Sequence, residues 1–170
     1  MDRITAEKIL ESDYDIIVLG SGVAGLAAAL SGSEHGAHVL VMEKAPPSQR
    51  GGNSRRSGSF RVAYGDIKSL KVLVKDLEGK AIQVPAYTED DYYQDLARVT
   101  NEKTDPDGGV RTDGRSRVIS KEGQPIPGLY AAGATTGGLL YDHYPLGASL
   151  MQAAVFGRIA GREAATIREA

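Results

Sequence analysis

The sequence predicts an α/β fold with a short parallel sheet flanked by helices, and three observations carry this prediction. Two short apolar runs, at residues 15–19 and 39–42, flank an Ala- and Leu-rich stretch, which is typical of a strand, a helix and a second strand. A glycine-rich turn, Gly20-Ser21-Gly22-Val23-Ala24-Gly25, joins the first strand to the helix. Near the other end of the chain, residues 148–167 predict a long helix with small residues on one face.

Length and composition predict a single globular domain. A chain of 170 residues can bury its own core, and 41% hydrophobic with 25% charged residues is a globular composition. The net charge of -2 gives no electrostatic reason to expect nucleic acid or an anionic membrane as a partner. The absence of cysteine excludes disulfides, thiolate metal ligands and cysteinyl-flavin bonds, and agrees with a reducing compartment. No apolar run reaches the roughly 18 residues of a membrane span, and residues 1–14 do not form a secretory signal, so we expect a cytoplasmic location.

The turn after the first strand has the Gly-x-Gly-x-x-Gly spacing of dinucleotide-binding βαβ units. A lone match is weak and is also compatible with an ordinary turn containing incidental glycines, but here strand, turn, helix, second strand and a terminal acid follow in order. Gly20 allows the sharp turn, Gly22 lets the backbone approach a pyrophosphate, and Gly25 lets the helix pack closely on the sheet. The positive end of the helix then faces the phosphates. Glu43 ends the second strand, where it can bond ribose hydroxyls.

The first half of the chain contains further predicted elements. We expect strands at 14–19 and 38–42, a helix at 23–35 that ends at Gly36, and an ordered loop at 44–59.

The middle of the chain is less regular. The pattern at 67–77 is ambiguous between helix and strand, and 81–84 follows a turn. Thr88 with the acids behind it predicts the capped start of a helix at 89–102.

Beyond the turn at residues 104–109, we expect a hairpin with strands at 110–112 and 117–120. Residues 128–133 predict a buried strand that runs into a tight turn. The final helix presents a small-residue face for close approach to another helix or to the sheet, which consists of Ala153, Gly157, Ala160, Gly161 and Ala164.

Three more segments carry chemistry. Residues 51–58, Gly-Gly-Asn-Ser-Arg-Arg-Ser-Gly, combine glycines that allow close backbone approach with neutral donors and with arginines that can bind a diphosphate, although a solvated loop would have the same composition. Residues 126–133 form the second segment and 137–151 the third, directly before the last helix. The amino-terminal end of that helix offers backbone N–H groups and a partial positive charge.

Together, the glycine turn and these three segments resemble the flavoprotein family of fumarate reductases and succinate dehydrogenase flavoprotein subunits, most closely its tricarballylate dehydrogenase-like branch. The similarity covers residues 14–107 and 108–165. It implies a Rossmann-like FAD-binding domain with non-covalent FAD, because no histidine precedes Gly51-Gly52, where covalently flavinylated relatives carry one. The residues that it implies for cofactor binding are Gly20, Gly22, Val23, Ala24, Gly25, Glu43, Lys44, Gly51, Gly52, Asn53, Ser54, Ala132, Gly133, Ala148, Ser149 and Leu150.

The same resemblance implies a single FAD-binding domain of the discontinuous type over residues 1–170. Its two segments are 14–107 and 108–170, and we expect the capping domain and the middle of the FAD domain, which the family carries between them, to be missing. The cap normally brings arginine and histidine residues that clamp the substrate and donate protons. Ala134 also stands where the family carries an acid, which removes one expected ribityl hydrogen bond.

His143 is the candidate catalytic residue, as a contact to a substrate carboxylate or as a proton donor; the alternative is a loop histidine bonded to backbone. Tyr141 and Tyr144 are equally compatible with flavin contacts and with ordinary packing. His35 and His38 have structural positions, and three dispersed histidines do not predict a metal site.

Three functions follow as hypotheses. The first is an FAD-dependent oxidoreductase domain whose parent chemistry is hydride exchange between flavin N5 and a carboxylate-activated C–C bond of a tricarballylate-, fumarate- or succinate-like substrate, with weakened FAD binding and little turnover in this chain. The second is a non-catalytic FAD-binding remnant or interaction subunit that associates with itself or a partner through apolar surface left by the missing cap. The third is a reductase that binds NAD(P) on the same βαβ unit.

Overall fold

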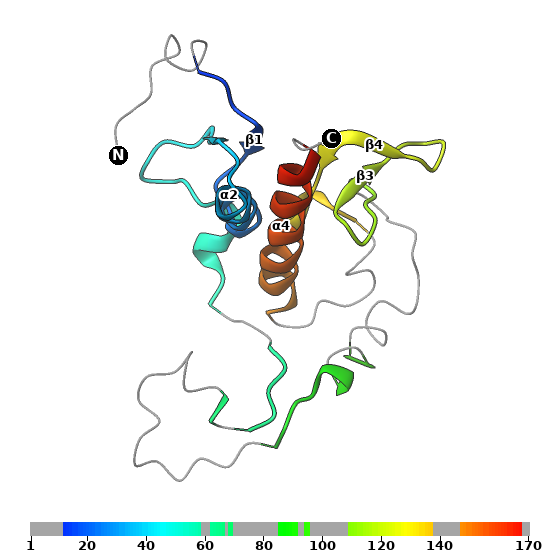
Figure 1. Cartoon of the computed structure of the whole chain (residues 1–170). Coiled ribbons are helices and arrows are strands. Elements are labelled where there is room, and N and C mark those ends of the chain that lie inside the picture. Colours follow the sequence, from blue (N-terminus) through cyan, green and yellow to red (C-terminus); the bar gives the residue numbers. More distant parts are fainter. Residues whose placement is uncertain are drawn as a thin grey trace.

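The structure is a computed structural model of the chain that describes residues 12–58, 62–66, 68–69, 85–91, 94–95, 109–137 and 147–167. In chain order its elements are β1 (Ile16–Leu19), α2 (Val23–Glu34), β2 (Val39–Met42), the 3-10 helix η1 (Gly52–Arg56), β3 (Arg117–Ile119), β4 (Pro125–Tyr130), the 3-10 helix η3 (Gly133–Thr135) and α4 (Ala148–Thr166). The predicted α/β fold is confirmed, with a short parallel sheet, helices and an antiparallel hairpin. Figure 1 shows α4 between α2 and this hairpin.

The parallel sheet consists of β1 and β2, paired from Ile16 with Val39 to Leu19 with Met42. The side chains alternate between the two faces of a strand. Ile16 and Val39 point at α2, because a Cβ added to Gly32 in α2 would lie 2.9 Å and 3.2 Å from their side chains. The helix therefore covers one face of the sheet. The observed strands are one or two residues shorter than the predicted ones.

The two long helices cross at glycines. A Cβ on Gly157 of α4 would overlap the carbonyl oxygen of Ala24 in α2, and one on Gly161 would overlap the carbonyl oxygen of Ala28. Two residues of the small-residue face expected in the last helix, Gly157 and Gly161, make this helix–helix contact. Because position 24 meets 157 and position 28 meets 161, the two helices run in the same general direction. This order of contacts brings both amino-terminal ends to the same side of the crossing.

The hairpin differs from the predicted one. β3 pairs antiparallel with β4 through a turn in which Ser120 N–H donates to the Gln124 carbonyl at 2.8 Å. The expected partner strand at 110–112 contributes only single bridges, from Thr112 to Val118 and from Val110 to Thr136. The cause is Asp113, whose carboxylate accepts the N–H groups of Arg115 and Arg117, each at 3.0 Å, and closes a side-chain turn in place of a longer ladder.

The expectation of a buried strand at 128–133 is wrong. In β4, residues 126–129 are exposed, with Leu129 at 47%, and only the two ends are half-buried. Pro125 and Pro127 cannot donate to a ladder, which is typical of an edge strand. Gly128 and Gly133 both have positive φ, at 74° and 76°, and Gly133 makes the predicted tight turn by opening η3.

The remaining predictions for the middle of the chain lie largely outside the described residues. This holds for the stretch at 67–77, for 81–84 and for most of the helix at 89–102. At the start of that helix, residues 89–91 are helical, and Asp91 N–H donates to Thr88 Oγ1 at 3.1 Å while Thr88 N–H donates to the Asp91 carboxylate at 2.8 Å. This is the predicted cap.

Two histidines have the structural roles expected of them. His35 Nδ1 lies 2.7 Å from the carbonyl of Ser31, and His38 Nδ1 lies 2.7 Å from that of Asp13. Within the described parts of the chain, no helix combines the length and hydropathy that a membrane crossing needs.

Substitution of Gly161 by alanine tests the helix crossing. The new methyl group overlaps backbone of α2, so we expect a loss of about 1–3 kcal/mol in unfolding free energy from overpacking, although alanine has the higher helix propensity. Urea unfolding followed by circular dichroism at 222 nm measures it. Val155→Ala on the exposed side of α4 is the control and should stay within about 0.5 kcal/mol of wild type. Equal stability of both variants would contradict the close crossing.

Candidate cofactor site

The glycine turn has the geometry that its Gly-x-Gly-x-x-Gly spacing predicts. Gly20 has φ +99°, and its N–H donates to the Met42 carbonyl at 2.7 Å, which turns the chain across the end of the sheet. A Cβ on Gly25 would overlap the carbonyl oxygen of Gly20, so α2 can pack this closely only on glycine. At Gly22 the nearest atom to an added Cβ is Ser54 Oγ at 3.6 Å. The backbone there is open enough for a ligand to approach.

The amino-terminal end of α2 presents backbone N–H groups and the positive end of the helix dipole. Gly22 is the N-cap and provides no side-chain bond, and the first turn of the helix holds no acidic residue. The first N–H, that of Val23, donates to Ser54 Oγ at 3.1 Å. Such an end binds anions well, because unpaired N–H groups and the helix dipole act together.

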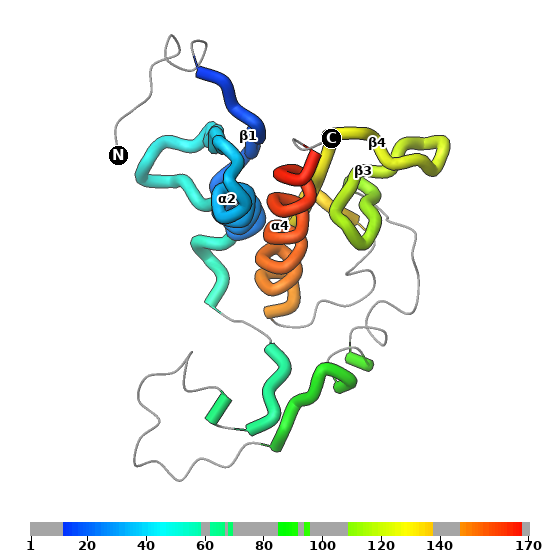
Figure 2. Tube along the Cα trace, viewed as in Figure 1, coloured from blue at the N-terminus to red at the C-terminus, as the bar shows by residue number. Residues whose placement is uncertain are grey.

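Ser54 belongs to the segment of residues 51–58, which we call the GG loop. The ordered loop expected here contains η1, which Figure 2 shows next to α2. Gly51 and Gly52 adopt φ +104° and +55°, and the stem of Arg55 covers Gly51. Asn53 and both arginines are exposed. The fold therefore holds the GG loop against the glycine turn.

Glu43 lies beside the same turn. Its Oε2 accepts the Ser21 hydroxyl at 2.6 Å and the Ser21 N–H at 2.9 Å, and its Oε1 accepts the Ala45 N–H at 2.8 Å. These bonds, that of the Ser21 side chain first, lower the pKa of Glu43 from 4.5 to about 2. The carboxylate is ionised at neutral pH, and lone pairs remain on it for further donors such as ribose hydroxyls. Lys44 follows it with an exposed side chain.

The turn at residues 132–133, from the carboxyl-terminal half of the chain, also lies at the first turn of α2. A Cβ on Gly133 would lie 2.9 Å from the Ala24 Cβ and 3.4 Å from the Ala153 Cβ, so the turn at 132–133 packs between the first turn of α2 and α4. The contact joins residues more than 100 positions apart in the sequence.

The leading end of α4 projects past that of α2. α4 begins nine residues before its contact at Gly157, whereas α2 begins one residue before Ala24. At 1.5 Å per residue, the end of α4 reaches about 12 Å further from the crossing. Its Ala148 and Leu150 are buried, at 3% and 6% exposure. Two positive helix ends are thus offset along one side of the molecule, which suits an extended ligand with phosphates at one end.

The structure brings most of the expected site residues together, and some of the others lie outside the described residues. The glycine turn, Glu43, the GG loop and the turn at 132–133 surround the first turn of α2. His143, Tyr141 and Tyr144 lie outside the described residues. Among the described residues, no three acidic or histidine side chains gather in a group that could hold a metal ion.

Two serines that the sequence analysis did not select contribute to this arrangement. Ser21 donates hydrogen bonds to Glu43, and its place between Gly20 and Gly22 was the sequence signal that could have indicated this role. Ser116 is fully buried with φ +62°, its hydroxyl donates to the Phe156 carbonyl of α4 at 3.0 Å, and its carbonyl accepts Ala131 N–H at 3.0 Å. It ties the segment before Gly133 to α4, and no sequence pattern in its polar turn indicated this.

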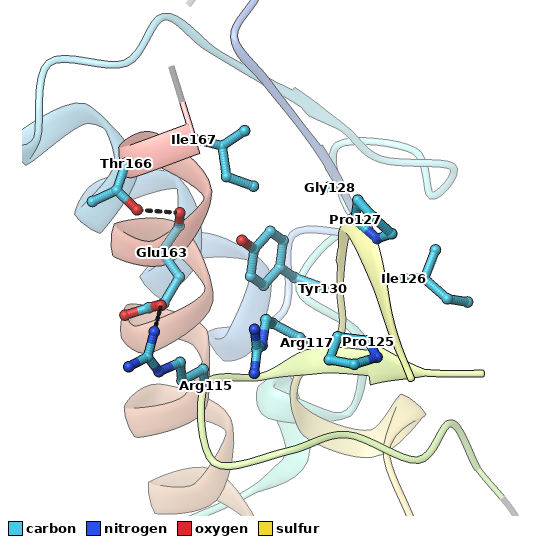
Figure 3. Close-up of a pocket in the computed structure, with 10 residues that line it drawn as sticks. All are labelled: Arg115, Arg117, Pro125, Ile126, Pro127, Gly128, Tyr130, Glu163, Thr166 and Ile167. Atoms are coloured by element: carbon cyan, nitrogen blue, oxygen red, sulfur yellow. Dashed lines mark hydrogen bonds and ion pairs between the residues drawn. The ribbon is translucent and has the colours of Figure 1, made fainter. Parts of the chain in front are cut away.

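A separate cavity of about 460 Å³ lies at the opposite end of α4. Figure 3 shows its lining, with the hairpin on one side and Glu163, Thr166 and Ile167 on the other. Its cations are already paired, Arg115 with Glu163 at 3.7 Å and Arg117 with Asp113 at 2.6 Å. Burial, and then Glu163, raise the pKa of Tyr130, which stays protonated at neutral pH. The cavity is not part of the arrangement around α2.

Comparison with protein families identifies the cofactor of the chain. The sequence matches the family described as FAD binding domain over residues 15–98 and 78–150, which together span most of the chain. The chain belongs to this FAD binding domain family. FAD is therefore its cofactor, and the match favours FAD over the nicotinamide alternative. The donor set agrees, because the open turn at Gly22, the positive end of α2 and the Glu43 carboxylate suit a diphosphate and a ribose.

Individual relatives are oxidoreductases. A segment of 59 residues is 46% identical to a fumarate reductase of Schizosaccharomyces pombe, covering 35% of this chain and 12% of that protein. Another of 60 residues is 43% identical to an NADH:acrylate oxidoreductase of Vibrio harveyi, covering 35% and 6%. A third of 83 residues is 36% identical to an N-methyl-L-tryptophan oxidase of Yersinia pestis, covering 48% and 22%.

The matched segments span less than a quarter of each of these relatives. They support an FAD-dependent oxidoreductase family.

Titration of Glu43 provides a test of its contacts in the FAD-binding domain. Its folded-state pKa of about 2 lies below 4.5, so the stability that it contributes is present above about pH 4.5 and is lost as the pH falls toward 2. We expect the gap in unfolding free energy between wild type and Glu43→Gln to be largest above pH 4.5 and to shrink below it. Urea unfolding at pH 6, 4 and 3 measures this gap.

The exposed Glu34→Gln, which loses one carboxylate at an ion pair with Arg158, is the matched control. A gap for Glu43→Gln that does not change with pH would contradict the hydrogen bonds from Ser21 and Ala45.

Proposed function

We propose that this chain binds FAD non-covalently around the first turn of α2, as the cofactor-binding domain of an oxidoreductase. The observation that carries the proposal is the meeting of four segments there. Ser54 bonds the first N–H of α2, Glu43 is held by the adjoining turn, and Gly133 packs on Ala24. An extended dinucleotide needs such contacts at several points along its length.

The proposed roles follow the chemistry of each group. Gly20, Gly22 and Gly25 shape the turn at the pyrophosphate, where the N–H groups of Val23 and Ala24 provide positive charge. Glu43, next to Lys44, accepts hydroxyls of the adenosine ribose. In the GG loop, Gly51, Gly52, Asn53 and Ser54 follow the diphosphate toward the flavin.

At the flavin end, Ala132 and Gly133 lie along the ribityl chain, together with Ala148, Ser149 and Leu150 of α4. The positive end of α4 stabilises negative charge on the ring system. FAD supplies hydride transfer when bound, and the protein supplies position and electrostatics.

For the substrate, we propose a di- or tricarboxylate with a C–C bond activated by a neighbouring carboxylate. Two of the relatives are named for fumarate and acrylate, and both of these molecules have a C=C bond conjugated to a carboxylate. The third is named for an amine, N-methyl-L-tryptophan. The proposal places the chain nearest the tricarballylate dehydrogenase-like branch, with His143 as the carboxylate contact or proton donor and with weak turnover.

The proposed domain is single and discontinuous, with segments at 14–107 and 108–170 and without the family's cap. We propose a cytoplasmic location, because a sequence without cysteine agrees with a reducing compartment.

Uptake of FAD by the purified chain is the direct test. We expect flavin absorbance bands to shift and flavin fluorescence to change on titration, and bound flavin to be reducible under anaerobic conditions. Protein that neither carries nor takes up FAD would refute the proposed function.

The role of Ser54 is tested by Ser54→Ala. The change removes the acceptor of the Val23 N–H and a donor to the diphosphate, so we expect the Kd for FAD to rise about tenfold or more, as a hydrogen bond to a charged group is worth about 1.5–3 kcal/mol. Ser57→Ala, three residues further along at an exposed position, is the matched control and should bind as wild type. Equal affinities of both variants would remove Ser54 from the site.

A second candidate function is a non-catalytic chain that associates through an apolar surface. The sheet face opposite α2 exposes large apolar side chains, with Ile17 at 59%, Leu19 at 80% and Met42 at 47%. Parallel sheets are ordinarily covered on both faces. Exposed apolar patches of this kind mark interfaces.

Sedimentation velocity over a range of concentrations tests the second candidate. We expect the wild-type chain to self-associate and Leu19→Lys to shift the distribution toward monomer, because the charge must be desolvated in an apolar contact. Lys44→Ala, an exposed change outside this face, should leave association as in wild type. A monomeric wild-type chain at all concentrations would exclude self-association through this surface.

A further inference from the structure

Ser21 makes two contacts to one oxygen of Glu43. Its hydroxyl donates to Oε2 at 2.6 Å and its backbone N–H donates to the same atom at 2.9 Å. Ser21 itself stands in the glycine turn, between Gly20 with its positive φ and Gly22 at the cap of α2. The turn that faces the diphosphate in the proposed site and the acid that faces the ribose are therefore joined directly by one side chain.

The other carboxylate oxygen is also fixed. Ala45 N–H donates to Glu43 Oε1 at 2.8 Å, so three donors hold the two oxygens. A glutamate side chain has large rotamer freedom, and fixing it before the ligand arrives removes that cost from binding. The backbone donors of Ser21 and Ala45 are present whatever the side chain at position 21. The Ser21 hydroxyl is the donor that depends on residue type.

The charge of Glu43 makes its position matter. The carboxylate accepts the N–H of Ser21, two residues before the first residue of α2, and the first turn of α2 holds no acid of its own. A carboxylate that is free to rotate is attracted to the N–H groups of a helix end. If Glu43 moved onto these groups, it would compete with the diphosphate for them. The donors from Ser21 and Ala45 hold the carboxylate in one orientation and oppose this movement.

We propose that Ser21 is a positioning residue, whose hydroxyl orients the Glu43 carboxylate toward the ribose and keeps it off the amino-terminal end of α2. The inference rests on the proposed FAD site. It predicts that Ser21 acts on FAD affinity through Glu43 and not by a contact of its own.

A double-mutant cycle tests this proposal with FAD as the probe. We expect Ser21→Ala to raise the Kd about three- to tenfold, as the net worth of one hydrogen bond suggests. In the Glu43→Gln background, Ser21→Ala should change the Kd less than about twofold, because the residue that it positions is already altered. Ser21→Thr keeps the hydroxyl and should restore most of the affinity. The exposed Ser33→Ala in α2 is the matched control and should bind as wild type.

A second readout does not involve FAD. In the apo protein, NMR titration of the side-chain carboxyl carbon should give Glu43 a pKa near 2, and Ser21→Ala should move it upward toward 4.5. An unchanged pKa, or additive effects of Ser21→Ala and Glu43→Gln on the Kd, would overturn the proposal. If the wild-type chain takes up no FAD, the proposed function fails, whereas normal uptake with an unaffected Ser21→Ala variant refutes only the role of Ser21.

Discussion

The close crossing of α2 and α4 is the contact on which the rest of the structure depends. Gly157 and Gly161 bring the α4 backbone against the carbonyls of Ala24 and Ala28, where no side chain fits. α2 is at the same time held on the sheet by Gly25 and Gly32. A segment near the start of the chain and one near its end thereby become one body, and the turn at Gly133 is trapped between them. Every proposed contact at the flavin end requires this packing.

The crossing also explains why two helix ends point to one side. Helix dipoles add when helices run in the same general direction, and the N-cap residue of each helix here is a glycine that provides no side-chain bond. Positive charge concentrated at two helix ends is unfavourable unless an anion, a polar group or solvent meets it. The offset between the two ends separates a position suited to phosphates from one suited to a flavin. This offset supports the proposed direction of the ligand, with its phosphates at α2 and its flavin toward α4.

Much of this could be predicted from local sequence, and the failures have physical causes. The βαβ unit and the small-residue face of the last helix follow from periodicity and residue size, which act over a few residues. The predicted partner of β3, the strand at 110–112, was wrong because the Asp113 side chain closes a turn there. β4, which contains two prolines, pairs with β3 instead. β4 was expected to be buried because its residues are apolar, but burial depends on a covering layer, which a strand does not specify. The role of Ser116 could not be predicted from local sequence, because its hydrogen-bond partners lie 15 and 40 residues away.

The three glycines of the Gly-x-Gly-x-x-Gly turn are of two kinds, those that the fold itself needs and one that it does not. Gly20 has a backbone conformation that other residues avoid, and Gly25 has backbone where a Cβ would be. Either would be required in a βαβ unit with no ligand at all. Gly22 is different, because its φ is ordinary at -70° and a Cβ there would meet nothing closer than 3.6 Å. Among the described residues, neither packing nor backbone strain requires a glycine at this position, and its missing side chain leaves the turn open to a molecule that approaches it.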